Sequence, residues 1–162
     1  MGSDERTTTR GGDTVVPADL PETKSEVRAR REDLRQALVE LEDVLSRPSG
    51  DHEAWNEHVR DGVERMHTTL QHHVRETESE GGMLAQLEED APWLEGRVDQ
   101  LRREHDQLLA ATDALLEHCR VAHDAEDIRE ETLELLRAIS RHRHQGTDLL
   151  YDAYMVDISA AD

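Results

Sequence analysis

The chain has 162 residues, which is enough for one domain around a single hydrophobic core. Its 38 acidic and 19 basic residues give a formal net charge of −19, and so acidic a surface repels nucleic acid and anionic lipid. We therefore expect neither nucleic acid nor a membrane among its partners. A single cysteine excludes an intrachain disulfide, and the sequence shows no apolar export signal, so we expect a cytoplasmic protein.

The first residues differ from the rest of the chain. Residues 1–19 are rich in Gly, Thr and Asp and lack any periodic pattern, which predicts a disordered N-terminal arm. The remainder, residues 20–162, shows helical periodicity and is predicted to form the folded domain.

Four segments of the domain carry apolar residues at helical spacing, and no stretch shows the alternation of a strand. They run from about 23 to 46, from 51 to 82 with a short extension to 87, from 90 to 119, and from 124 to 153. Four helices of this length with short connections predict an all-α, antiparallel up-down four-helix bundle.

The second helix contains two histidines that face different ways. Its apolar stripe is centred near Met66. On a helix with about 100° per residue, His73 lies about 50° from the stripe centre and Thr77 about 10°. His72 lies about 150° away and Glu76 about 110° away, although the two have the spacing of a metal-binding pair. The inward pair is therefore predicted to be His73 and Thr77.

The third and fourth helices each place one more histidine on the inner face. His105 lies within about 20° of the centre of its stripe. On the fourth helix, His142 and Gly146 face inward, whereas His144 and Asp148 lie about 150° or more from the centre. Neutral imidazole is a common ligand of iron, zinc and copper, and bundles build metal sites from inward groups on facing helices. The three inward histidines are therefore a candidate metal site.

Three stretches resemble the hemerythrin-like, or HHE cation-binding, family: "LQHHVRETESEGGML", "LRREHDQLL" and "HRHQGTDLLYDAYMVDI". The resemblance covers about residues 23–158. It implies a four-helix bundle that holds two irons on histidines and carboxylates. Members of this family carry or sense oxygen, handle iron or nitric oxide, or decompose peroxide, so the implied partners are a metal ion and a small diatomic ligand.

Four positions depart from the pattern that the resemblance implies. Arg31 stands at the first-helix histidine, Thr77 at the bridging glutamate, Leu109 at a second third-helix histidine and Gly146 at the last carboxylate. Two divalent ions in a dry core without anions are very costly, and an arginine adds further positive charge. The sequence therefore argues against a normal di-iron centre and for a degenerate site.

Three interpretations stay open. In the first, His73, His105 and His142 hold one ion, either iron or zinc. In the second, the core is metal-free and the bundle serves as an interaction or sensor module. In the third, a local shift of helical register turns two histidine–carboxylate pairs inward: His72 with Glu76, and His144 with Asp148. The patterns contain no set of catalytic residues, so an enzyme is the least favoured class, and they identify no protein partner.

Overall fold

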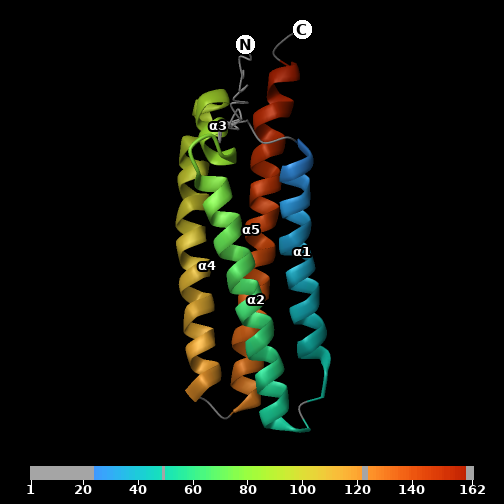
Figure 1. Ribbon diagram of the computed structural model, residues 1–162. Coiled ribbons are helices and arrows are strands. Elements are labelled where there is room, and N and C mark those ends of the chain that lie inside the picture. Colours follow the sequence, from blue (N-terminus) through green and yellow to red (C-terminus); the bar gives the residue numbers. More distant parts are fainter. Residues whose placement is uncertain (1–23, 49, 122–123, 160–162) are drawn as a thin grey trace, which may run out of the picture.

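A computed structural model describes residues 24–48, 50–121 and 124–159, without the side chains of 24–28, 30–31 and 156–159. The expected arm, residues 1–19, and the side chain of Arg31 lie outside this description. Every element in the described ranges is helical, which confirms the all-α prediction, and the four long helices lie side by side (Figure 1). The elements are α1 (Lys24–Ser46), α2 (His52–Glu78), α3 (Met83–Asp90), the 3-10 helix η1 (Pro92–Leu94), α4 (Glu95–Val121) and α5 (Ala125–Ser159).

Local sequence signals set the ends of α2. Asp51 caps its start, where the side chain accepts a hydrogen bond from the amide of Ala54 at 3.1 Å. Beyond its end, Gly81 has φ +78°, and a Cβ on Gly82 would lie 2.5 Å from the carbonyl oxygen of Glu76. The expected extension of this segment is therefore a separate short helix, α3.

The core consists of two hydrophobic clusters, one above the other along the helices. The larger cluster joins α1, α2, α4 and α5, and the smaller one joins α3, η1, α4 and α5. On α4, Leu108 belongs to the larger cluster and Leu101 to the smaller. On α5, Ile139 belongs to the larger cluster and Leu149 to the smaller. Between the two clusters both helices therefore have room for a polar layer.

Helices α1 and α2 approach each other closely at one point. A Cβ on Gly62 of α2 would lie 2.9 Å from Cδ1 of Leu41 on α1, and Leu41 is fully buried. The small residue lets the two backbones come together here. This contact fixes the position of α1 beside the face of α2 that carries His73.

The outer faces of the long helices carry many charged side chains. Several pair along one helix, such as Arg35 with Glu32, and Arg47 with Asp43 at 2.6 Å. Exposed pairs of this kind contribute at most about 1 kcal/mol each, so packing of the two clusters holds the fold. Within the described ranges, no helix is both long enough and apolar enough to cross a bilayer.

Candidate metal centre

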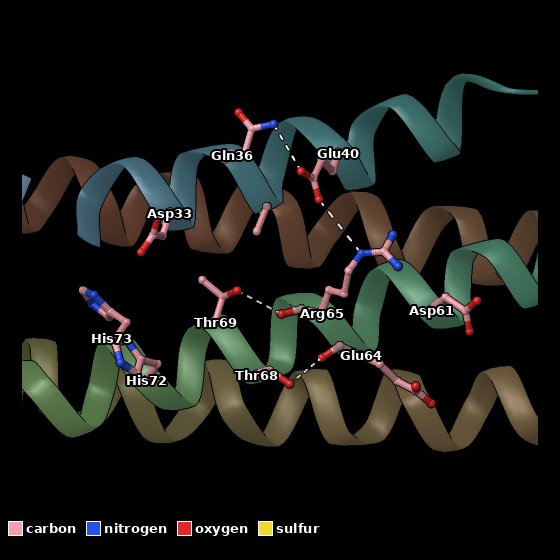
Figure 2. A pocket seen from close by; sticks show the side chains of 11 residues that line it. Asp33, Gln36, Glu40, Asp61, Glu64, Arg65, Thr68, Thr69, His72 and His73 are labelled. Carbon is pink, nitrogen blue, oxygen red and sulfur yellow. Dashed lines mark hydrogen bonds and ion pairs between the residues drawn. The ribbon is translucent and has the colours of Figure 1, made fainter. Parts of the chain in front are cut away.

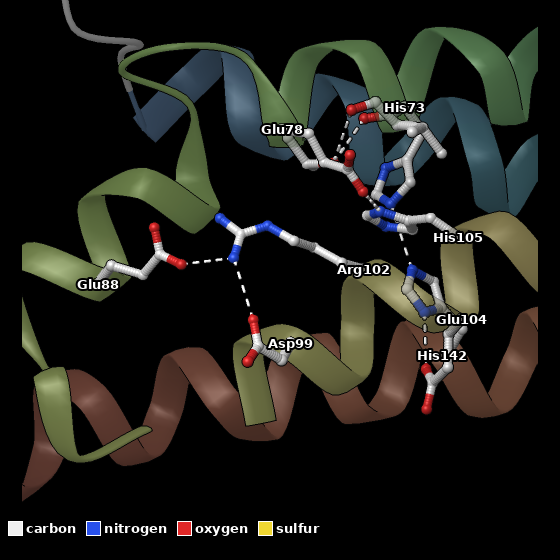
Figure 3. Close-up of polar contacts among 10 residues, drawn as sticks. His73, Glu78, Glu88, Asp99, Arg102, Glu104, His105 and His142 are labelled. Carbon is white, nitrogen blue, oxygen red and sulfur yellow. Dashed lines mark hydrogen bonds and ion pairs between the residues drawn. The ribbon is translucent and has the colours of Figure 1, made fainter. Parts of the chain in front are cut away.

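Three histidines from three helices meet in the layer between the two hydrophobic clusters. His73 comes from α2, His105 from α4 and His142 from α5, and Figure 3 shows their rings next to one another. One ligand nitrogen of each lies within 4.8 Å of those of the other two, and the ring centroids are 4.7–5.6 Å apart. Among the described residues, these three make up the one group of potential ligands that meets so closely.

The spacing of these nitrogens is close to the spacing of the ligand nitrogens around a bound metal ion. The Nε2 atoms of His73 and His142 are 3.4 Å apart. A tetrahedral zinc ion with Zn–N bonds of about 2.0–2.1 Å holds its ligand nitrogens about 3.3–3.4 Å apart. One pair therefore already has the required separation, and a pair at the 4.8 Å limit would close by about 1.4 Å on binding.

Two of the three rings rest on a carboxylate through Nδ1. Nδ1 of His105 lies 2.6 Å from Oε1 of Glu78, and Nδ1 of His142 lies 2.9 Å from Oε2 of Glu104 (Figure 3). A neutral imidazole that donates its Nδ1–H to a carboxylate carries its lone pair on Nε2. Such carboxylate–histidine pairs orient the ring and make it a more basic metal ligand.

Glu104 is itself held by neighbours on both sides. Nε2 of Gln100, one turn earlier on α4, donates to Oε1 at 3.0 Å. With its amide oriented to donate, Gln145 of α5 reaches the two oxygens of Glu104 at 2.6 and 2.8 Å. This network fixes the carboxylate against His142, so the imidazole has one defined orientation.

Burial keeps His105 in the form that binds metal. It lowers the pKa of His105 to about 4, with a smaller contribution from the neighbouring His142. Burial also raises the pKa of Glu78, and the nearby Asp106 raises it further, whereas Arg102 lowers it. At neutral pH the His105 imidazole is therefore neutral. The two carboxylates behind the rings would together balance the charge of one divalent ion.

The carboxylates are the residues that the helical stripes did not reveal. Glu104 is about 100° from His105 around α4, so it lies beside the stripe rather than on it. Glu78 is the last residue of α2, where the stripe ends. The adjacent letters Glu-His in "LRREHDQLL" are the available signal for Glu104, but its partner His142 is on another helix.

The residues of the shifted-register interpretation lie elsewhere. His72 is exposed, and its Nε2 lies 3.3 Å from Oε1 of Glu76 in a pair along α2. His144 and Asp148 are both exposed on α5. None of these four side chains belongs to the cluster of three histidines.

The positions where the resemblance implies further ligands have other environments. Thr77 is buried, and its hydroxyl donates to the carbonyl of His73 at 2.8 Å. Leu109 is partly buried and packs against the larger hydrophobic cluster. A Cβ on Gly146 would meet no atom within 4 Å, so space is open beside His142. The structure brings together the three predicted histidines without the additional ligands of a two-metal site.

Comparison of the chain with protein-family models, with curated proteins and with solved structures gives no match. The resemblance to hemerythrin-like proteins accordingly remains a prediction from the sequence. The function has to be inferred from the geometry and chemistry of the site.

Proposed function

We propose that this protein is a cation-binding helical-bundle protein that holds one divalent transition-metal ion, zinc or iron(II), on His73, His105 and His142. The observation that carries the proposal is the pair of carboxylates on the Nδ1 atoms of two of the rings. A buried imidazole that binds no metal needs a hydrogen-bond partner on each of its two nitrogens. Carboxylates on Nδ1 of both rings, with the ligand nitrogens converging, are the arrangement that metal sites use.

Charge favours one ion rather than two. Glu78 and Glu104 balance a single dication, whereas a second ion would enter a core with no further anion among the cluster residues. Three nitrogen ligands also leave one coordination position for water or a small molecule, as in catalytic zinc sites. His73 is only partly buried, which supports access to that position.

The wider proposal is an antiparallel up-down four-helix bundle of the hemerythrin-like kind with a degenerate metal site. The packing of α1 on α2, of α2 on α4 and of α4 on α5 supports this arrangement. By the resemblance, the function is iron, oxygen or redox handling or sensing, and the ligand at the open position is a small diatomic molecule. These roles rest on the three sequence stretches alone.

A metal-free interaction or sensor module is the second candidate, and one observation favours it. Glu104 can accept from Nδ1–H of His142, whose Nε2 can in turn accept from Nε2–H of His73 at 3.4 Å. This chain partly satisfies the buried imidazoles without an ion. Metal binding would replace the hydrogen bond between the two histidines.

Titration of chelator-treated protein with cobalt(II) distinguishes the metal-binding protein from the metal-free module. We expect saturation at one equivalent with the intense visible absorption of a four-coordinate site, and its loss in His73→Ala, His105→Ala and His142→Ala. The matched controls His72→Ala and His144→Ala should bind as the unaltered protein does. Loss of binding in these controls would support the shifted register, and absence of uptake with unchanged helicity would support the metal-free module.

A further inference from the structure

A groove between α1 and α2 leads to the three histidines. It has a volume of about 760 Å³, and His73 is among the residues that line it. Figure 2 shows Asp33 of α1 at the same end as His72 and His73, and Asp61 of α2 toward the other end. We call this the acidic groove.

Carboxylates dominate the charge of the acidic groove. Asp33 and Glu40 of α1 and Asp61 and Glu64 of α2 line it, and Arg65 is the one guanidinium among the lining residues. Nε of Arg65 lies 3.9 Å from Glu40, so this cation is already paired. With neutral histidines, four carboxylates and one guanidinium give the groove a formal charge of −3.

His73 belongs both to the groove and to the metal-binding cluster. His105 and His142 are 2% and 4% exposed, and leucine-rich clusters lie on either side of them along the helices. His73 is partly exposed and lines the acidic groove. Solvent in the groove therefore reaches the cluster at His73.

We propose that the acidic groove is the entry path along which a hydrated divalent cation reaches the three histidines, with His73 as the first ligand it meets. This inference rests on the proposed function. Clefts lined by one sign of charge raise the local concentration of the opposite ion and speed its association by about 10–10³-fold. Three of the four carboxylates of the groove are exposed and Asp61 is half-buried, so they attract a cation without holding it in place of the imidazoles.

The rate of cobalt(II) binding to the full chain, followed by stopped-flow absorbance at low salt, tests the path. The groove variant Asp33→Asn/Asp61→Asn/Glu64→Gln leaves the Glu40–Arg65 pair in place. It should bind about tenfold more slowly, with unchanged stoichiometry and dissociation rate, and the deficit should shrink at high salt. The matched control removes three exposed carboxylates that do not line the groove: Glu117→Gln/Glu130→Gln/Glu134→Gln. It has the same net charge and should bind within about twofold of the unaltered rate.

A plug in the groove gives a second, steric test. Thr69 lies one helical turn before His73 and lines the groove between His73 and Arg65. Thr69→Trp should slow association and dissociation by the same factor and leave the Kd unchanged, because a neutral plug raises the barrier along the path without changing the energy of the bound ion. Equal association rates for the groove and control variants, together with unchanged cobalt(II) binding rates in Thr69→Trp, would overturn the proposed path while leaving the metal site intact. Absence of cobalt uptake by the unaltered protein would overturn the proposed function and the path with it.

Discussion

The Nδ1 atom of His142 on α5 lies 2.9 Å from Oε2 of Glu104 on α4, and Glu104 immediately precedes His105. Two consecutive residues of α4 thus serve the site in two ways. One is a candidate ligand, and the other orients a candidate ligand on the neighbouring helix. Because Glu104 is only 19% exposed, solvent weakens this charge-assisted hydrogen bond little.

The orienting role of Glu104 predicts that Glu104→Gln lowers metal affinity without changing stoichiometry. Loss of the carboxylate removes the negative charge behind His142, and changes of this kind typically weaken metal binding about 10–100-fold. Competition with a chelator of known affinity measures the effect. The matched control is Glu131→Gln, since Glu131 lies 2.8 Å from Nδ1 of His118 in a pair outside the cluster. Equal affinity losses in the two variants would contradict a specific role for Glu104.

The pKa of His105 predicts an acid-sensitive contribution to stability in the metal-free protein. Burial lowers this pKa from 6.5 to about 4, so between these values the unfolded chain binds more protons than the folded one. The contribution is constant above about pH 6.5 and falls as the pH drops toward 4, by a total on the order of 3 kcal/mol.

Urea unfolding of the chelated protein at several pH values measures this loss. The many carboxylates also titrate, so the quantity to follow is the difference in free energy of unfolding from the variant His105→Gln. That difference should become smaller as the pH is lowered from 6.5 to 4. A difference independent of pH would show that His105 keeps an ordinary pKa in the folded chain.

The open space at Gly146 predicts that Gly146→Ala stabilises the protein by about 1 kcal/mol, because alanine is the better helix former and its Cβ meets nothing within 4 Å. Gly82→Ala should do the opposite, since its Cβ would clash with the carbonyl oxygen of Glu76. Chemical denaturation of both variants measures the two changes in the free energy of unfolding and their signs. Destabilisation by Gly146→Ala would mean that this space is required by the fold.

Cys119 is predicted to be unreactive in the folded protein. It is buried, and burial raises the pKa of its thiol to about 11 from 9.0. The reactive thiolate is therefore about 100-fold scarcer than in an ordinary cysteine at pH 8. Labelling with a disulfide reagent should be at least that much slower in buffer than in urea. Comparable rates in the two conditions would show that the larger cluster opens readily.

Much of the fold was predictable because its signals are local. Asp51 and the Gly81–Gly82 pair mark helix ends through capping and backbone conformation. The 3.6-residue period gave the inward direction of His105 and His142, and both are buried. These features depend on one helix at a time, so one sequence is enough to predict them.

The rest of the site depends on how neighbouring helices are placed. Glu78 and Glu104 reach the histidines from the flanks of their own helices, and the contact with His142 depends on the rotation of α4 against α5. The acidic groove likewise exists because of the separation of α1 and α2. No periodic pattern encodes these distances, so the ligand candidates could be predicted from the sequence, whereas the carboxylates that support them could not.

The central claim, one divalent ion on three histidines, is tested most directly by the metal content of the loaded chain. Chelated protein is equilibrated with zinc(II) or, anaerobically, with iron(II), and is then desalted while its helicity is followed. We predict one ion per chain, and none in His73→Ala of unchanged helicity. Two ions per unaltered chain, or none at all with the helices intact, would contradict the account.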